Sequence, residues 1–222
     1  MDRSAHSFSR LFAALLLALL ASGCALGRSV VTVQAPTAGA SDSKDYAKII
    51  EVRDSRKFEI DPPKPSIPSL GEAADLSNPQ ITARAIARKR GGFGKAFGDV
   101  VLPEGSTVAG LVRSAAEKAL QDKGYNVVDD KSPEYANAKA LSVEIDQFWA
   151  WFTPGFVSVS VDFQSDVSLR GSELVGPDPQ IASSHVHYET AAVFESTWAD
   201  TVRRGVDDLV QRIEEKLRPS SR

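Results

Sequence analysis

Cys24 is the residue whose chemistry is most constrained by the sequence, because it is the only cysteine in the chain of 222 residues. A single cysteine can form neither an intramolecular disulfide nor a cysteine-based metal cluster. Any role of its thiol must therefore be inferred from the neighbouring sequence. The first question is therefore what kind of segment leads to Cys24.

Residues 1–23 have the features of a secretory signal peptide. Arg3 and Arg10 precede an uninterrupted apolar run at residues 11–21, which is too short to cross the roughly 30 Å hydrocarbon core of a bilayer as a helix. Small residues follow, and the stretch LLASGC resembles a bacterial lipobox. This resemblance implies cleavage before Cys24 and attachment of diacylglycerol to its thiol. The alternative is an ordinary cleaved signal that precedes a free cysteine.

Acyl chains on Cys24 would be the link to the membrane. One chain gives marginal binding and two or more hold firmly, so the folded part need not contribute. Ala25 follows the cysteine, at the position where aspartate favours inner-membrane retention in enterobacterial lipoproteins. The resemblance therefore implies a protein anchored in the outer membrane and facing the periplasm.

A glycine-rich stretch at residues 91–98 superficially suggests a phosphate-binding loop. Ala96 follows Lys95, where a P-loop needs serine or threonine, and the glycine spacing does not fit the dinucleotide-binding pattern. We expect a surface loop and no cofactor.

Basic residues are concentrated between Ile81 and Gly98, where five cations occur and no acid. Such a patch could meet anionic headgroups or an acidic partner, each cation adding about 1 kcal/mol near a charged surface. A solvated face is the alternative. Four of the cations are kept as candidates for an interaction surface: Arg84, Arg88, Lys89 and Arg90. The formal net charge of −3 argues against nucleic-acid binding.

Acidic residues on two predicted strands could form a cluster. If a hairpin turns at Pro154, Asp146 falls opposite Asp162, and with Asp166 they could hold Ca²⁺, which prefers several oxygen ligands. The register is insecure, and an exposed acidic face is the simpler interpretation. We predict no metal site here.

His185 and His187 share one face of a predicted strand. Two ligands are too few for zinc without a third, so a surface pair is expected. The sequence contains no G-x-S-x-G nucleophile motif. We therefore predict that the protein is not an enzyme.

Aromatic residues crowd the tip of the predicted hairpin. Strict alternation places Trp149 and Trp151 on the core side and Phe148 and Phe152 on the outside. Exposed aromatic clusters mark interaction sites, so Phe148, Phe152 and Phe156 are predicted to form a binding surface. The alternative is that the neighbouring proline-rich segment covers them.

Two amphipathic helices and several strands must position these residues. Apolar residues at helical spacing predict helices at residues 107–123 and 198–217, with Ser106 and Thr197 as caps. Alternating residues predict strands at 49–54, 141–150, 157–169 and roughly 182–194, and residues 81–89 fit either a strand or a short helix. The expected fold class is α+β, a two-layer sandwich. An antiparallel sheet of about four to five strands would carry two long helices on one face.

The expected organisation follows from these elements. Residues 1–23 are the signal peptide, residues 24–45 the lipidated N-terminus and a tether, and residues 46–222 a single α+β domain. A brief apolar run at Val30, Val31 and Val33 could form an edge strand within the tether. A proline-rich excursion interrupts the domain at about residues 61–79, because proline excludes helix and central strand.

The mature chain resembles the YajG-like bacterial lipoproteins. The resemblance is carried by the lipobox, by VRDSR at residues 52–56, by KALQDKGYNV at residues 118–127 and by LSVEIDQFWA at residues 141–150. That family has no accepted catalytic residues, so the resemblance implies a non-enzymatic envelope protein that binds an envelope partner. The alternative is an auxiliary lipoprotein of an ABC-type lipid transporter, which would bind lipid or a transporter subunit.

Overall fold

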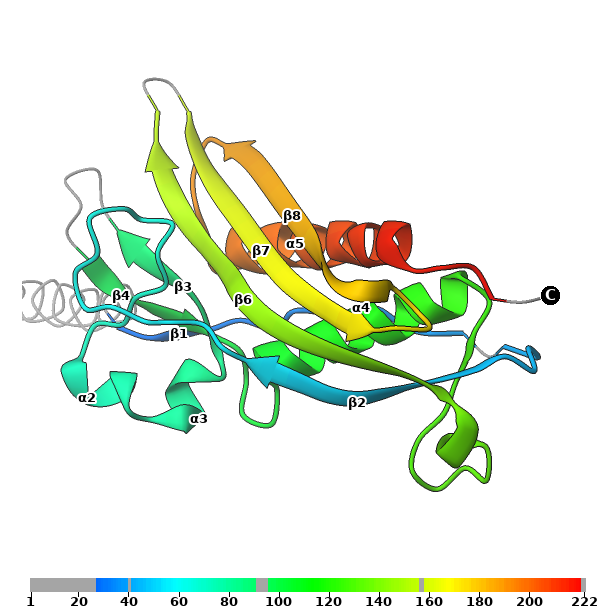
Figure 1. Cartoon of the computed structure of the whole chain (residues 1–222). Coiled ribbons are helices and arrows are strands. Elements are labelled where there is room, and N and C mark those ends of the chain that lie inside the picture. Colours follow the sequence, from blue (N-terminus) through cyan, green and yellow to red (C-terminus); the bar gives the residue numbers. More distant parts are fainter. Residues whose placement is uncertain (1–26, 40, 91–95, 156–157, 221–222) are drawn as a thin grey trace, which may run out of the picture.

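One long strand, β6 (Lys139–Pro154), organises the molecule (Figure 1). The computed structural model describes residues 27–39, 41–90, 96–155 and 158–220. On one side β6 pairs antiparallel with β7 (Val159–Gly171), which pairs antiparallel with β8 (Gly176–Thr190). On its other side β6 has two partners in succession along its length. The first is β2 (Tyr46–Asp54), which is parallel to β6, and the second is β3 (Ala85–Arg90).

Three shorter strands complete an eight-stranded mixed sheet in the described part of the chain. β4 (Ala96–Val101) is antiparallel to β3, β1 (Ser29–Val30) is parallel to β4, and β5 (Asn126–Val127) is parallel to β2. The α+β class is confirmed. The expected antiparallel sheet of four to five strands is wrong, because several strands are too short to show an alternating pattern and pair in parallel with segments far away in the sequence.

Helices α4 (Val108–Asp122) and α5 (Glu195–Lys216) contact each other and lie on one face of the sheet (Figure 1). Two four-residue helices, α2 (Ala73–Leu76) and α3 (Pro79–Thr82), and the 3₁₀-helix η2 (Tyr135–Asn137) also occur in the described residues. The expected complement of two helices is therefore too small.

The caps of the two long helices differ from the predicted ones. Thr107, not Ser106, caps α4, its hydroxyl accepting from the Gly110 N–H. α5 starts at Glu195, before the predicted Thr197 cap, and Thr197 Oγ1 instead accepts from the N–H of Phe194. Each helix nevertheless buries the apolar stripe that its periodicity indicates.

A β-bulge at Asp146 reverses which residues of β6 face the helices. Ile145 pairs with Val167 and Gln147 pairs with Asp166, so Asp146 is an extra residue without a partner in the register. Leu141, Val143 and Ile145 are buried before the bulge. After it the even-numbered Phe148 and Ala150 join the same core, and Trp149 joins a smaller core on the opposite face.

The placement of Phe148 is therefore a correction. We expected Phe148 to be exposed, and its exposed fraction is 0%. Its ring packs edge-on against Phe163 of β7, with 4.9 Å between ring centroids. One extra residue moves every later side chain to the other face of a strand, and nothing in the alternating pattern marks that residue.

The proline-rich excursion covers part of the face of the sheet opposite the long helices. Leu70 is fully buried in a cluster with Trp149, and Phe58 packs edge-on against the Trp149 ring at 5.9 Å between centroids. The buried Arg56 guanidinium donates to the carbonyl oxygens of Thr82, Ala85 and Phe148 at 2.7–3.0 Å. The excursion thus covers Trp149, which the alternating pattern had placed on the side of the long helices.

The part of the expected tether that carries the apolar run belongs to the folded domain, and the edge strand considered there forms as β1. Val31 and Val33 are buried in the main core, and the Val31 N–H donates to the carbonyl of Val101. The N–H of Gly27 also donates to the carbonyl of Phe97 in β4, so the N-terminal segment contacts the sheet from the first described residue.

Candidate binding site along strand β8

Strand β8 is a long edge of the sheet. In the described residues it pairs only with β7, and no strand lies beyond it in Figure 1. Near the start of β8 lie Pro177 and Pro179, which have no backbone N–H and so discourage pairing with another strand. From Gln180 to Thr190 the strand has no proline, so its outward N–H and C=O groups form a template for an additional strand.

A groove runs along this edge, between β8 and α5. It has a volume of about 400 Å³ and is lined by Ile181, Ser183 and His185 from the strand and by Asp208, Arg212, Glu215 and Lys216 from the helix. Arg212 forms ion pairs with Asp208 and Glu215, each at 3.4 Å. Ile181, at the margin of the groove, is 59% exposed, more than most apolar residues of this chain.

A polar cluster lies beside the groove, on the face of β7 and β8 that the helices do not cover. The buried Asp162 carboxylate accepts hydrogen bonds from Thr153 Oγ1 at 2.7 Å and Ser160 Oγ at 3.2 Å. His187 Nδ1 lies 2.6 Å from the other carboxylate oxygen. This hydrogen bond is the main reason that the pKa of His187 is raised, and Glu189, at 3.7 Å from Nε2, adds to the effect.

The polar cluster is not arranged for nucleophilic catalysis. A hydroxyl nucleophile needs its base within hydrogen-bond reach, and here both hydroxyls donate to Asp162 and not to His187. Among the residues that the structure describes, no group of three His, Cys, Asp or Glu side chains is placed to hold a metal ion. The arrangement instead presents a protonatable imidazole on a fixed carboxylate.

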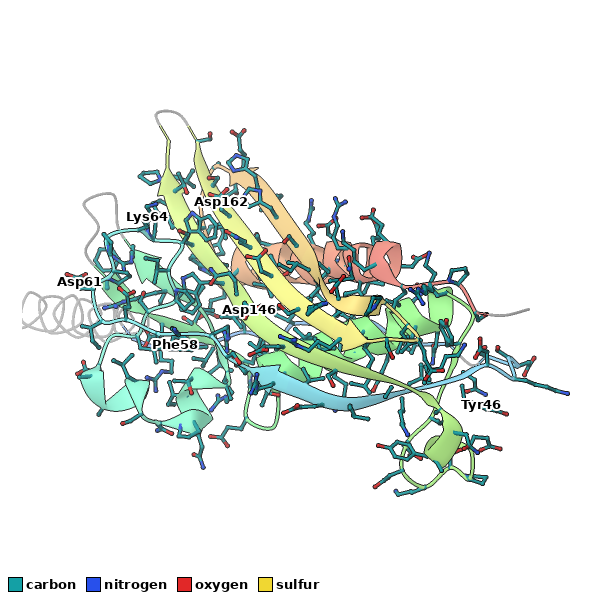
Figure 2. All side chains as sticks on the ribbon, in the orientation of Figure 1. Tyr46, Phe58, Asp61, Lys64, Asp146 and Asp162 are labelled. Atoms are coloured by element: carbon teal, nitrogen blue, oxygen red, sulfur yellow. The ribbon has the colours of Figure 1, made fainter. Side chains whose placement is uncertain are left out.

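The acidic cluster considered across the hairpin does not form, because Pro154 pairs with Val159 and the hairpin therefore turns beyond Pro154. Asp162 pairs with Trp151, and Asp146 accepts a hydrogen bond from Ser168. Figure 2 shows Asp146 and Asp162 apart along the sheet. Sequence reasoning found that His185 and His187 share a face, but it missed Asp162 as the partner of His187.

Trp151 is the aromatic residue that the structure brings to this face. Its ring is half-buried and lies 6.3 Å from the imidazole of His185, centroid to centroid. Phe152 is half-buried and packs against the main core, and Phe156 lies outside the described residues. Of the predicted aromatic surface, the exposure of Phe148 is therefore wrong, the contribution of Phe156 stays a prediction, and Trp151 is an aromatic residue on this face that was not predicted for it.

The basic residues near β3 hold the fold together. Arg88 is buried, 8% exposed, and its guanidinium donates to the carbonyls of Ile60 and Leu70 in the excursion. Arg90 donates to Ser69 Oγ at 3.3 Å, and Lys89 donates to Ser29 Oγ at 3.0 Å. Arg84 donates to the carbonyl of Leu102 at 2.8 Å.

The expectation of an exposed basic patch is therefore corrected for Arg88, which is inside the protein. Its neighbour Asp99 is also buried, 4% exposed, and this burial raises the pKa of the Asp99 carboxyl. The sequence alone does not distinguish an exposed basic run from a run of basic residues that donate hydrogen bonds to the backbone carbonyls of a covering segment.

Cys24 and the predicted signal peptide lie outside the described residues. Within the described part, no helix has the length and apolar character needed to cross a membrane.

Comparisons with known proteins give distant likenesses. No protein-family model and no curated protein matches the sequence. Similar solved structures include an uncharacterized protein with a TM-score of 0.43 and 8% identity, which covers 86% of this chain and 97% of that one. Protein XCC0632 from Xanthomonas campestris, of the DUF330 family, has a TM-score of 0.41 and 11% identity, covering 85% and 90%.

A minor lipoprotein from Acinetobacter baumannii is also similar, with a TM-score of 0.33 and 15% identity over 50% of this chain and 87% of that one. The structural neighbours thus include a bacterial lipoprotein and proteins of unassigned function. At TM-scores below 0.5 they carry no argument about function. The narrower resemblance to YajG-like lipoproteins stays a prediction.

Proposed function

We propose that this protein is a lipid-anchored envelope protein whose folded part binds an extended segment of another envelope protein along strand β8. The anchor is the one that the lipobox-like sequence before Cys24 indicates, with Ala25 favouring the outer membrane and a domain that faces the periplasm. The observation that carries the binding role is the unpaired edge of β8, which in the described residues has a strand on one side only.

An added strand would satisfy the backbone groups along this edge and place alternate side chains in the groove. Main-chain hydrogen bonds supply affinity in this mode of recognition, and the pockets beside the strand supply specificity. The two acids and two bases that α5 contributes to the groove carry no net formal charge. The groove therefore suits a polar, nearly neutral segment, with one apolar side chain against Ile181, and its affinity should depend only weakly on salt.

A non-enzymatic role agrees with the arrangement of the polar cluster, in which both hydroxyls serve Asp162. The alternative of a lipid-binding transport component needs an apolar cavity. The space between the helices and the sheet is instead filled by fully buried side chains, including Phe148, Phe163 and Val206. We therefore place protein binding first.

Photo-crosslinking in the cell envelope tests the proposal. A photoreactive amino acid at position 181 should give one discrete crosslinked protein, identified by mass spectrometry, and the same residue at position 50 should not. Ile50 is a matched control because it is an isoleucine on another strand, β2, and is 53% exposed.

A paired substitution measures the contribution of the edge to binding. Ile181→Lys should abolish copurification of the crosslinked protein, and Ile50→Lys should not affect it, with both variants folded by circular dichroism. Equal binding by the two variants would contradict the use of β8. Cys24→Ala tests the anchor separately, because this variant should move from the membrane fraction to the soluble fraction. A variant that stays with the membrane would rule out lipidation.

A further inference from the structure

A second cavity lies away from β8, between α4, β2 and the segment that leads from β5 to η2. Its volume is about 400 Å³, and its lining residues are Ile49, Arg113, Glu117, Gln121, Val127, Val128, Asp129, Asp130 and Tyr135. No residue of this cavity belongs to the groove along β8. A cavity of this size can hold a small molecule.

Helix α4 forms one wall of the cavity. Arg113, Glu117 and Gln121 follow one another at intervals of four residues, so they form a single stripe along the helix. Gln121 Oε1 is buried and has no hydrogen-bond partner. A buried acceptor without a partner is costly, and in native proteins it calls for an explanation such as a missing ligand.

Glu117 lies one turn before Gln121 on the same wall and is half-buried. Burial raises the pKa of its carboxyl, and the positive charge of Arg113 offsets this only in part. No hydrogen bond to the Glu117 carboxyl is found among the described residues, whereas the Arg113 guanidinium donates to the carbonyl of Ile49 at 3.3 Å. The wall therefore presents one buried acceptor without a partner and, beside it, a half-buried carboxyl that no described side chain or N–H group donates to.

The opposite wall adds negative charge and an aromatic ring. Asp129 and Asp130 bring the lining to three carboxylates against one guanidinium. Tyr135 is held in place by Lys48, whose ammonium donates to the Tyr135 carbonyl at 2.7 Å and lies 4.5 Å from the ring centroid. The cavity as a whole favours a positively charged occupant that is rich in hydrogen-bond donors.

We propose that this cavity is a binding site for a small organic cation with a primary ammonium or guanidinium group. The cationic group would donate to Glu117 and to Gln121 Oε1, and the acids of the opposite wall would take further donors. An anion would meet repulsion from three carboxylates, and an apolar molecule would leave both acceptors without partners. The inference is independent of the binding role of β8.

Calorimetric titration of the full-length protein, purified in detergent, tests the site with spermidine and agmatine as probes. Glu117→Gln removes the charge and keeps the shape, so it should weaken binding by about tenfold or more, the range of one charge-assisted hydrogen bond. Gln121→Glu adds a carboxylate in the cavity and should tighten binding. Glu214→Gln removes a carboxylate from α5, outside the cavity, and is the matched control.

Three results would overturn the proposal. One is failure of both probes to bind the wild-type protein, and another is equal weakening by Glu117→Gln and Glu214→Gln, which would indicate diffuse attraction to an acidic surface. The third is that neither the Gln121→Glu variant nor the Glu117→Gln variant changes the affinity for the probes, while both are folded by circular dichroism. None of these results bears on crosslinking at position 181, so the two proposals can fail separately.

Discussion

Gly205 of α5 lies directly against the ring of Phe163 on β7. A Cβ atom built on Gly205 would lie 2.1 Å from Phe163 Cδ1, far inside any real contact. The Gly205 carbonyl also accepts a hydrogen bond from Ser184 Oγ of β8 at 3.0 Å. The absence of a side chain at position 205 is therefore what lets α5 approach β7 and β8 closely.

Gly205→Ala should destabilise the protein, although alanine favours a helix by about 1 kcal/mol over glycine. Overpacking against Phe163 costs about 1–3 kcal/mol and should exceed that gain. The free energy of unfolding in urea measures the net effect. Gly110→Ala in α4, where the nearest atom is Thr107 Oγ1 at 3.3 Å, should cost less. Equal losses in the two variants would contradict the close approach.

Phe148→Ala should cost about 3–5 kcal/mol of folding free energy, because the ring is fully buried against Phe163. Phe152→Ala should cost less, since Phe152 is only half-buried. Denaturant titration of both variants distinguishes the bulged strand from an unbulged one. A strand with strict alternation would expose Phe148, and Phe148→Ala would then leave stability unchanged.

Arg56→Lys should destabilise the protein by about 1–3 kcal/mol, because lysine cannot reproduce the fork that serves three carbonyl oxygens and Asp54. The excursion should also become sensitive to proteases. Arg53→Lys is the control, because Arg53 is exposed and, among the residues that the structure describes, forms an ion pair only with Glu144, a contact worth less than about 1 kcal/mol. Limited proteolysis with fragment mapping to residues 61–79 gives the answer.

His187 should make the stability of the protein depend on pH. Its pKa in the folded protein is raised by Asp162, so its contribution to stability is fully present below its ordinary pKa of about 6.5 and is lost as the pH rises through the raised value. Between pH 6 and pH 8 the wild type should lose more stability than His187→Gln. Asp162→Asn should flatten the pH dependence in the same way, and an unchanged profile in both would exclude the pair.

Glu117→Gln should raise the melting temperature of the unliganded protein at neutral pH. The pKa of Glu117 is raised by burial, so its ionised form opposes folding above the raised pKa. The difference between wild type and variant should vanish below about pH 4, where both the folded and unfolded states bind the proton. A lower melting temperature for the variant at pH 7 would show that the carboxylate has a partner that stabilises it.

The helices and the α+β class were predictable because a buried stripe on one face of a helix leaves a clear period in the sequence. The faces of the side chains in the second half of β6 were not predictable. The extra residue at Asp146 moves each later side chain to the opposite face of the sheet, and no residue type signals it. An edge strand could be suggested at β1 from the apolar run of residues 30–33, but its parallel pairing with β4 leaves no pattern in the sequence. The excursion was recognised by its prolines, but the face that it covers depends on that parity.

Part of the β8 site could be predicted as well. The shared face of His185 and His187 follows from alternation within one strand, whose pairing is regular from Gln180 to Thr190. Their neighbours come from β6 and β7, so Trp151 and Asp162 could be placed only with the correct register. Charge alone places Arg88 at the surface, but its carbonyl partners, Ile60 and Leu70, lie 28 and 18 residues away in the sequence.

The packing of Ser29–Val30 against β4 has a consequence for how far the domain can stand from a bilayer. A free segment from Cys24 to Asp45 would reach about 75 Å when extended, but the five residues from Cys24 to Ser29 reach about 18 Å at most. With lipid on Cys24, only a short tether would connect the domain to the membrane, and the β1–β4 edge would lie near the headgroups. A short tether restricts the orientations of the domain relative to the membrane. Any partner of β8 must therefore bind while the domain is in one of those orientations.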